Sequence, residues 1–198
     1  FVKMLPARDP VERIAQGVPC AYDAGRIEAG ATRYFANGMD VGFGAHGAWN
    51  MRKVPAWLTG CSAYLGALVL TMVRYPQLSV RIGIDGGEPV AQTTTIAAVM
   101  NGRSFGGSFL VCPDARADDG WLDLMISKGC SRLDILALVP KILRGTHAGD
   151  PRLRLARAKK LTIESDAPLL VEADGEIAFE DARRLAIEVL PGALRVLA

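Results

Sequence analysis

Residues 78–100 read LSVRIGIDGGEPVAQTTTIAAVM, and this stretch decides the fold. From Leu78 to Ile84 an apolar side chain occupies every second position, the period of a strand with one buried face. Asp85-Gly86-Gly87 comes next and is typical of a tight hairpin turn. Residues 90–100 are rich in threonine, valine and isoleucine and predict the returning strand. The stretch therefore predicts two antiparallel strands joined by a hairpin.

Similar short apolar segments recur on both sides of this hairpin, separated by turns that contain glycine. Together they predict a mainly β fold, a β-sandwich of many short antiparallel strands with two substantial helices. A further short helix is expected to start at Asp9 and to end near Gly17. The other strands are expected at residues 21–28, 32–37, 40–43, 109–112, 121–127, 161–164, 169–172, 177–180 and 185–189.

The first of the two substantial helices is predicted at residues 56–74. Up to Val73 it carries no charge over 18 residues, which reaches the lower length limit for a membrane span. Its glycine and hydroxyl residues, and the basic residues on either side, favour a buried helix of a soluble domain instead. The second helix is predicted from Ser131, a capping residue, to a stop at Gly145, with a kink at Pro140. Its apolar face is expected to consist of Leu133, Leu136, Ile142 and Leu143.

The composition is that of one ordinary folded domain. The chain has 198 residues, half of them apolar, which excludes a disordered protein and permits a core that needs no disulfide. Its net charge of +2 excludes a polyelectrolyte that coats nucleic acid. The four cysteines form no CxxC pair, so we expect buried, reduced thiols in a cytosolic protein. These cysteines are Cys20, Cys61, Cys112 and Cys130, of which Cys61 and Cys112 have apolar neighbours.

A glycine motif and a basic run have ordinary structural explanations. Residues 42–47 read GFGAHG, which matches GxGxxG, but the acidic residue that a dinucleotide site needs downstream is missing. Its glycines are expected to allow a bend or close packing. His46 and His147 are expected to be structural or solvated, because no catalytic triad can be argued from spacing alone. The basic run at residues 152–160 predicts either a solvated strand face or a surface for anionic lipid.

Two acidic turns leave two interpretations open. Asp114 to Gly120 departs from the EF-hand pattern and predicts a turn between strands, yet its carboxylates and carbonyls also suit magnesium or calcium. Asp174-Gly175-Glu176 lies between two apolar segments, and Asp-Gly is typical of a hairpin turn. A carboxylate at such a strand end could also serve as a general base.

Several of these elements, in this order, resemble the C-terminal domain of the diacylglycerol kinase-like lipid kinases. That family is related to the sphingosine kinases and, more distantly, to the NAD kinases. The resemblance covers nearly the whole chain, and its weight comes from the number of elements in register. The matching elements are Asp23-Ala24-Gly25-Arg26, Tyr34-Phe35-Ala36-Asn37, Val41-Gly42-Phe43, Asn101-Gly102-Arg103 with Phe105-Gly106-Gly107, Pro113-Asp114-Ala115 with Asp118-Asp119-Gly120-Trp121-Leu122-Asp123, Gly145-Thr146-His147, Asp174-Gly175-Glu176 and Leu190-Pro191-Gly192-Ala193-Leu194.

The resemblance implies a set of site residues. A structural Mg²⁺ would be held by the side chain of Asp119 and by main-chain oxygens of Arg116 and Trp121. Glu176 would be the general base that takes the proton from a lipid hydroxyl, with Asp174 beside it. Phosphoryl transfer needs mostly positioning and charge neutralisation, which suits these roles.

The resemblance also implies what the chain does and lacks. The family's GGDGT nucleotide loop does not occur here, so residues 1–198 are expected to be a single C-terminal domain that faces the lipid and is inactive alone. ATP would be bound mostly by the missing domain, and the protein would be cytoplasmic and would contact the membrane transiently from its surface. A homodimer is compatible with this picture, and no nucleic acid partner is expected. The lipid itself stays open.

Two other functions remain as alternatives. The chain could be a non-catalytic lipid-binding or regulatory module that shares the fold. An NAD kinase is disfavoured, because its nicotinamide-side pattern is not evident and the PxA…DDGxLD loop at residues 113–123 points to the lipid branch.

Overall fold

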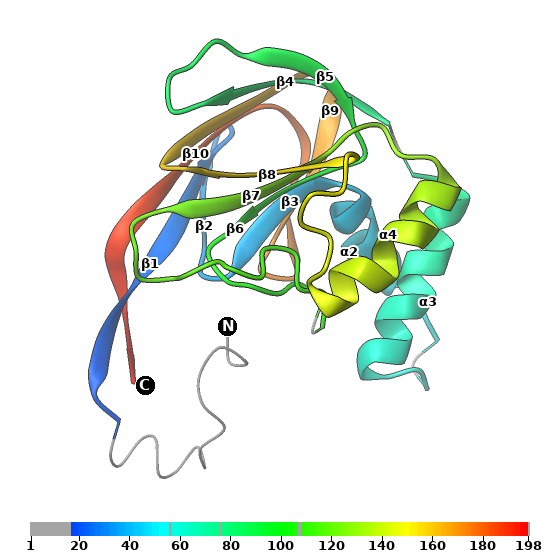
Figure 1. The fold of residues 1–198 in the computed structure, drawn as a ribbon, viewed down its shortest axis with the longest axis horizontal. Coiled ribbons are helices and arrows are strands. Elements are labelled where there is room, and N and C mark those ends of the chain that lie inside the picture. The colour runs from blue at the N-terminus through cyan, green and yellow to red at the C-terminus, as the bar shows by residue number, and fades with distance from the viewer. Residues whose placement is uncertain (1–16, 56, 76, 107, 198) are drawn as a thin grey trace.

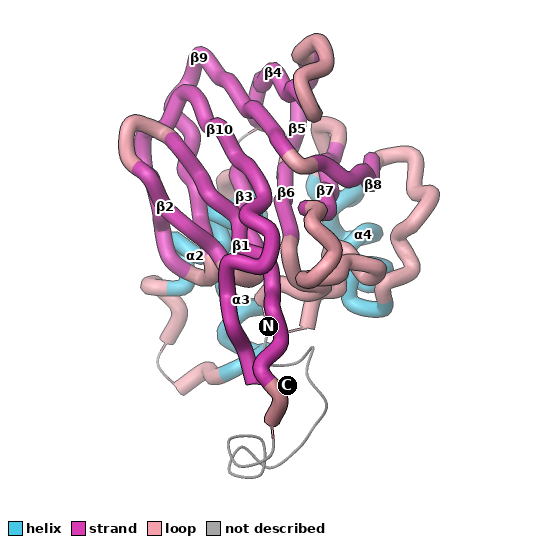
Figure 2. Tube along the Cα trace, turned by 90° about the vertical axis from the view of Figure 1, so that its left-hand side faces the viewer, coloured by secondary structure: helices cyan, strands magenta, loops and turns pink. Residues whose placement is uncertain are grey.

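The computed structural model describes residues 17–197 except positions 56, 76 and 107 (Figure 1). These residues form one ten-stranded sheet, in which most strands run antiparallel to their neighbours. In Figures 1 and 2 the strands make a curved body, and three helices gather at one end of it. The mainly β, sandwich-like prediction is confirmed, whereas the short helix expected from Asp9 lies outside the described residues.

The described elements follow one another in a simple order along the chain. The strands are β1 (Pro19–Glu28), β2 (Thr32–Phe35), β3 (Gly38–Gly42), β4 (Leu78–Ile84), β5 (Val90–Thr94), β6 (Ile96–Met100), β7 (Leu122–Ser127), β8 (Leu153–Ala158), β9 (Lys160–Ala173) and β10 (Glu176–Leu197). The helices are α2 (Phe43–Met51), α3 (Gly60–Val73) and α4 (Arg132–Arg144). The main path through the sheet is β2-β1-β10-β9-β3-β6-β7-β8, and β4 branches from β9 with β5 beside it.

The predicted hairpin of β4 and β5 is confirmed. Leu78 pairs with Thr94 and Ile82 with Val90, and the amide of Gly87 donates to the carbonyl of Ile84 across the turn at 2.9 Å. The returning segment, however, is two strands rather than one. At its break the hydroxyl of Ser127 accepts the amides of Thr95 and Ile96, at 3.1 and 3.0 Å. These side-chain bonds end the pairing with β4, so β6 can pair with β3 and β7.

The C-terminal quarter departs from the prediction of several short strands. It consists of two long strands, β9 with 14 residues and β10 with 22. Their pairing shifts register at three places between Ile177 and Arg184, and such irregularities bend long strands. Because β9 is long and bent, it pairs with β10, β3 and β4. It thus connects the strands β2, β1 and β10 to β3 and to the β4–β5 hairpin. The main core fills this fold with side chains that are almost fully buried, including Ile27, Met39, Leu124, Ile163 and Leu185.

Two local predictions are wrong. Residues 109–112 form no strand, only a single bridge between Phe105 and Phe109. The glycines of residues 42–47 were expected to allow a bend or close packing, and no helix was predicted there; Phe43–Met51 form the additional helix α2 directly after β3. The glycines of this segment do pack closely, as predicted: a Cβ at Gly42 would strike the Thr95 carbonyl, and one at Gly44 the Asp40 carboxylate. Close approach at these two positions lets the helix lie against the sheet.

Helix α4 begins and ends where predicted, but only part of its predicted apolar face is right: Ile142 and Leu143 pack against the core, whereas Leu133 and Leu136 do not. Ser131 and Asp134 form a reciprocal capping box, and Gly145 ends the helix in the left-handed conformation with φ of 68°. The buried side chains are Ile135 and Leu138, whereas Leu133 and Leu136 are 77% and 54% exposed. Ile135, Leu138, Val139 and Ile142 form the i, i+3, i+4, i+7 stripe that packs against the neighbouring elements.

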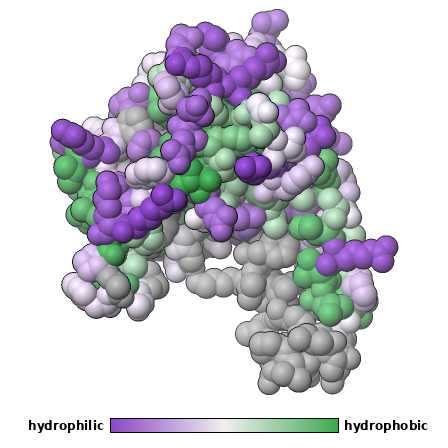
Figure 3. Space-filling model, turned by 180° about the vertical axis from the view of Figure 1, so that it is seen from behind, coloured by the Kyte–Doolittle hydropathy of each residue, from purple (hydrophilic) through white to green (hydrophobic). Residues whose placement is uncertain are grey.

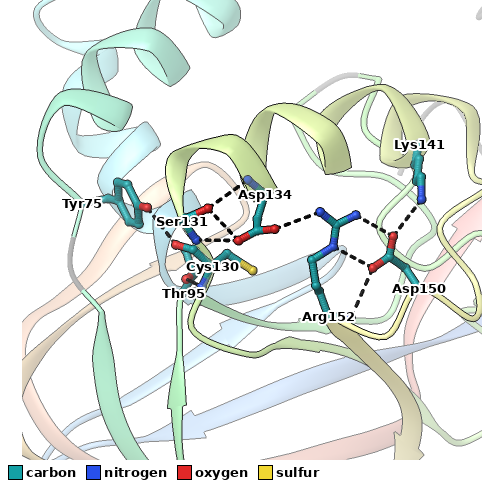
Figure 4. A network of polar contacts seen from close by, with 8 residues as sticks. All are labelled: Tyr75, Thr95, Cys130, Ser131, Asp134, Lys141, Asp150 and Arg152. Carbon is teal, nitrogen blue, oxygen red and sulfur yellow. Dashed lines mark hydrogen bonds and ion pairs between the residues drawn. The ribbon is translucent and has the colours of Figure 1, made fainter.

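A polar network fixes the start and the end of α4 (Figure 4). Asp134 joins the helix cap to Arg152, which also binds Asp150 through two nitrogens at 2.8 Å. Lys141 from the last turn of the helix donates to the same Asp150 carboxylate at 2.8 Å. These contacts hold the pKa of Asp150 well below its usual range, because Arg152 and Lys141 stabilise the ionised form. Part of the basic run therefore serves to hold α4 in place.

Helix α3 is a surface helix rather than the buried helix that was predicted. Ala67 and Thr71 point inward and are almost fully buried, while Val69 and Val73 are more than half exposed. Arg132 of α4 donates to the carbonyls of Met72 and Val73, at 2.8 and 2.9 Å. The end of α3 and the start of α4 therefore lie side by side.

The side chain of Cys61 in α3 lies outside the described part, whereas Cys112 and Cys130 are buried and unpaired, and Cys20 is half-buried and unpaired.

Candidate functional site

Residues from several of the motifs that are scattered along the chain meet in one polar network, whose first centre is Asp23. Its side chain is almost fully buried. The carboxylate accepts the amide of Gly120 at 2.7 Å and the amide of Gly192 at 2.8 Å. The main-chain amide of Asp23 donates to the carbonyl of Ala117 at 2.6 Å. Asp23 thus binds the predicted metal loop to the last strand.

Asn101 is the second centre of the network. Its buried side-chain amide donates to the carbonyls of Asp23 and Ala36, both at 2.8 Å. The main-chain amides of Asn101 and Gly102 both donate to the carbonyl of Asn37, again at 2.8 Å. One side chain therefore joins three motifs that are far apart in sequence.

Asp174 is the third centre, and the structure places it in a hairpin turn, as the simpler interpretation predicts. Asp174 and Gly175 have φ of 51° and 96°, and positive values at both positions are typical of a tight two-residue turn between strands. The Asp174 carboxylate accepts the amides of Ala36, Asn37 and Gly38, at 2.6, 2.9 and 3.0 Å. Both its oxygens are thus used to hold the β2–β3 connection.

Glu176 differs from its neighbour Asp174. It is the first residue of β10, opposite Ala173, and its side chain is exposed. The two residues predicted to work together therefore have different surroundings, with one carboxylate bound to the backbone and the other open to solvent. The structure leaves Glu176 accessible to a substrate, which a general base requires.

In the predicted metal loop, the carboxylates of Asp119 and Asp123 both lie near the guanidinium of Arg157. The Asp119 carboxylate accepts the amide of Trp121 at 3.1 Å and forms an ion pair with Arg157, which also lies 3.6 Å from Asp123. Burial raises the pKa of Asp123 to about 6; Arg157 opposes this shift, and Asp119 and Asp114 add to it. Asp123 and Arg157 were not identified as site residues from the sequence, although Asp123 belongs to the DDGxLD motif.

The donor set of this loop fits a hard cation. One oxygen of Asp123 is buried without a donor, and the carboxylates of Asp119 and Asp123 share the guanidinium of Arg157. Mg²⁺ prefers oxygen ligands of the kind that Asp119 and the carbonyls of Arg116 and Trp121 would provide. Within the described ranges, no three acidic, histidine or cysteine side chains come together as a metal site. The Mg²⁺ assignment stays a prediction from the resemblance.

An apolar cavity lies between the sheet and the helices. Its volume is about 90 Å³, and α2, α3, α4, β6, β7 and the segment around Phe109 supply its walls. Nearly all the lining is hydrophobic, with representative side chains from Phe43, Leu68, Met125 and Leu138. The sequence did not reveal this cavity, although the apolar stripe of α4 was a signal that could have shown one wall of it.

A buried pair of carboxyl groups, Asp40 and Glu172, was also missed. They lie opposite each other on β3 and β9, 1% and 0% exposed, and Asp40 lines the cavity. Burial raises the pKa of Glu172 to about 9 and that of Asp40 to about 7, because each charged form loses water, and the charge of Asp40 raises the pKa of Glu172 further. The pair titrates as a unit. The alternation of polar and apolar residues could not reveal this carboxyl pair, because every residue of β3 is buried.

The two histidines contact backbone carbonyls. His46 Nδ1 lies 2.9 Å from the carbonyl oxygen of Gly42, and the buried His147 has its Nε2 atom 3.0 Å from that of Val111. These contacts agree with the structural roles that the sequence predicts. On the basic run, Arg154, Lys159 and Lys160 are exposed, as expected for a solvated strand face.

Comparison with known proteins identifies the family of this chain. Residues 40–198 match the family model described as the YegS C-terminal NAD kinase beta sandwich-like domain. A diacylglycerol kinase of Mycobacterium tuberculosis H37Rv is 31% identical over 201 residues, which cover 98% of this chain and 63% of that protein. A Stenotrophomonas maltophilia protein named "Probable lipid kinase YegS-like" is 30% identical over 92% of this chain and 59% of its own length.

Solved structures show the same fold. A diacylglycerol kinase structure from Bacillus anthracis covers 94% of this chain with a TM-score of 0.61 at 16% identity, and 56% of its own chain is matched. A second crystal structure from that organism superposes with a TM-score of 0.70 at 20% identity. The chain thus spans about six-tenths of the length of the relatives that it matches. With its motifs gathered in one network and its family model matched over most of its length, the chain belongs to the YegS-type C-terminal domain family of lipid kinases.

Proposed function

We propose that this chain is the lipid-binding part of an ATP-dependent lipid kinase that phosphorylates a lipid hydroxyl, such as that of diacylglycerol. The observation that carries this proposal is the apolar cavity, because a hydrocarbon chain is the ligand that such a lining favours. At about 90 Å³ the cavity would have to widen to hold a full acyl chain. Its walls include three separate helices, whose movement would provide that room.

The reaction itself would take place at the Asp174 turn. Glu176 would take the proton of the lipid hydroxyl as that oxygen attacks the γ-phosphoryl group of ATP. Asp174 would keep the turn in position by binding the amides of Ala36, Asn37 and Gly38. Asp119, with main-chain oxygens of Arg116 and Trp121, would hold Mg²⁺, which supplies positive charge to the loop. The Asp23 and Asn101 bonds would couple this loop to the turn.

ATP would be bound mostly by a nucleotide-binding domain outside these residues. The proposal rests on the relatives, which are longer than this chain by about two-fifths of their length, and on the missing GGDGT sequence. By this proposal the 198 residues alone would bind lipid without phosphorylating it.

A membrane surface is the proposed source of the lipid. Exposed apolar side chains occur just before α3, along α3 and on α4, and the surface view from behind shows hydrophobic groups at the edge where α3 lies (Figure 3). These side chains belong to Trp57, Val69, Leu70, Val73, Leu133 and Leu136. None of the helices in the described part is long and apolar enough to cross a membrane. A peripheral contact through this patch would lie close to the cavity, which the inner faces of the same helices line. The homodimer stays a prediction.

A non-catalytic lipid-binding module is the second candidate. It is favoured by one observation: residues of this chain form the walls of the apolar cavity. Such a module would bind lipid equally well but would give no phosphoryl transfer when it is supplied with a nucleotide domain.

The deciding experiment joins this chain to the nucleotide-binding part of the M. tuberculosis diacylglycerol kinase. Transfer of labelled phosphate from ATP to dioctanoylglycerol is then measured. We expect activity, and we expect Glu176→Gln to lower kcat by roughly 10²- to 10⁴-fold, because the base is lost while the shape is kept. Glu180→Gln changes another exposed glutamate of β10 and serves as the matched control.

The outcomes separate the two candidates. An active chimera with full activity in Glu176→Gln would remove Glu176 as the base. A well-folded chimera that binds both ATP and lipid and yet transfers no phosphate would favour the non-catalytic module.

A further inference from the structure

The buried Asp40–Glu172 pair lies between the two parts of the molecule that the proposed reaction uses. One oxygen of Asp40 accepts the amide of Ala45, in the first turn of α2, at 2.6 Å. One oxygen of Glu172 accepts the amide of Gly175, in the turn that leads into Glu176. Helix α2 supplies one wall of the apolar cavity, so the pair stands between that wall and the proposed base.

The other two oxygens of the pair need a proton. Oδ2 of Asp40 and Oε2 of Glu172 are buried without a donor. Ionised carboxylates only accept hydrogen bonds, so two of them side by side cannot satisfy each other. The two side chains lie within hydrogen-bonding range, and a protonated carboxyl group donates to its partner. One proton between them therefore joins two separate backbone contacts into a continuous link from α2 to the turn.

The strands and the turn around the pair are apolar or acidic. Across the sheet, Asp40 pairs with Ala98 of β6 and Glu172 pairs with Ile177 of β10. Asp174 in the adjoining turn acts on Glu172 with the same negative charge. These neighbours favour a pair that keeps a proton over a pair of two charges.

Helix α2 fits closely against the pair. A Cβ at Gly44 would strike the Asp40 carboxyl group, so glycine lets the first turn of the helix approach this far. His46 is the titratable side chain of α2, and its Nδ1 atom lies 2.9 Å from the carbonyl oxygen of Gly42. Helix α3, which packs beside α2, has no charged residue. Two carboxylates in this space would repel each other, and neither could move away without displacing α2 or the turn.

We propose that Asp40 and Glu172 are positioning residues, which share one proton and thereby link the turn that carries Glu176 to the first turn of α2. Loss of that proton leaves two buried negative charges side by side, so the link breaks and the base loses its position relative to a lipid in the cavity. The inference rests on the proposed function in one respect: Glu176 is the base that acts on a lipid in this cavity.

The link is tested first by NMR in the 198-residue chain, without lipid or ATP. The amides of Ala45 and Gly175 lie at its two ends, and their signals should shift at the same pH values as the pair loses its protons. The last of these shifts is expected at about 9, the pKa to which burial raises Glu172. The amide of Gly87 donates to a main-chain carbonyl and is the control that should not follow. Different midpoints at the two ends would overturn the link.

The consequence for the reaction is tested in the chimera with the nucleotide-binding part. Glu172→Met removes the carboxyl group at similar volume and should lower kcat by roughly 10- to 100-fold with little change in KM, because the base is displaced while the cavity keeps its walls. Glu172→Gln should rescue kcat relative to Glu172→Met. Its amide group donates permanently to Asp40, and its oxygen still accepts the amide of Gly175.

The pH profile is a readout that a purely structural role would not move. Between about pH 8 and 10 the kcat of the wild-type chimera should fall by ~10-fold, because the raised pKa of Glu172 is about 9. Glu172→Gln has no such proton to lose and should keep its kcat over this range. Glu188→Gln changes a half-buried glutamate of β10 that pairs with Arg26, and it should follow the wild type. This comparison decides the matter even if Glu172→Met fails to fold.

The outcomes keep this inference apart from the proposed function. If the chimera is active and Glu172→Gln has the wild-type pH profile, the positioning role is overturned and the proposed function stands. If the chimera transfers no phosphate while the amides of Ala45 and Gly175 shift together, the proposed function fails and the link between α2 and the turn is supported.

Discussion

Two groups of acidic residues in this domain differ in how many of their carboxylate oxygens accept a hydrogen bond. Around Asp23 and Asp174, every carboxylate oxygen is met by backbone amides, and the result is a rigid junction of distant segments. At Asp40 and Glu172, each group has one oxygen with a donor and one without, beside an apolar cavity. Acidic residues of a family motif can therefore be structural. A buried carboxyl pair with fewer hydrogen-bond donors than acceptor oxygens, in contrast, marks a place for a proton or a ligand.

The largest expected effect concerns pH and the unbalanced pair. Because burial raises both pKa values, the folded state binds more protons than the unfolded state above about pH 4. The stabilising contribution of the pair is therefore complete below that pH and is lost as the pH rises, through about 7 for Asp40 and about 9 for Glu172. Between about pH 5 and 9 the free energy of unfolding should fall by several kcal/mol relative to Asp40→Asn/Glu172→Gln, because each group that keeps a proton which the unfolded chain has lost contributes ~1.4 kcal/mol per pH unit. Urea unfolding at each pH measures the difference between the two proteins, and parallel pH profiles would refute the assignment.

The next effect is a loss of stability at the centre of the saturated network. Asn101→Ala removes two buried hydrogen bonds and leaves the carbonyls of Asp23 and Ala36 without a donor, so we expect a loss of about 3 kcal/mol. Asn50→Ala is the control, since that half-buried side chain donates to Thr71 and otherwise only accepts an exposed bond from Lys53, and its loss should be about 1 kcal/mol. Equal losses would mean that the network does not hold the domain together.

Asp174 tests whether a motif carboxylate is structural. Asp174→Ala removes three backbone contacts and should cost about 2 kcal/mol, measured by urea unfolding. Glu176→Ala, two positions along, should cost no more than about 0.5 kcal/mol because its side chain is exposed. A reversed order of these losses would exchange the roles that we assign to the two residues.

The smallest expected effect is that of Mg²⁺ on thermal unfolding. A saturating concentration of Mg²⁺ should raise the Tm by about 2–4 °C, corresponding to roughly 1 kcal/mol of binding energy, and Asp119→Ala should abolish the rise. Arg157→Gln should enlarge it, because it frees the Asp119 carboxylate from its ion pair. An equal metal response in the wild type and Asp119→Ala would contradict the metal assignment.

Local patterns predicted much of this fold, and their failures have physical causes. The hairpin of β4 and β5, the cap of α4 at Ser131 and the stop at Gly145 depend on neighbours in sequence, and all three are present. The break at Thr95 depends on Ser127, which is 32 residues away. Likewise, α4 exposes Leu133 and buries Ile135, a choice made by the elements that pack against it. Helix α2 was missed because its glycines lower helix propensity, whereas packing against β3 overrides that preference.

The sequence by itself determined the β4–β5 hairpin, the turns and the motifs that identify the family, because each depends on residue types at fixed spacings. The tertiary structure alone decided which motif carboxylates meet backbone donors, which one stays exposed, and that Asp40 and Glu172 face each other at the cavity. These outcomes depend on pairings between β3 and β9, which are more than a hundred residues apart. Burial and the balance of donors and acceptors arise only when such distant strands come together, and they determine what each carboxyl group can do.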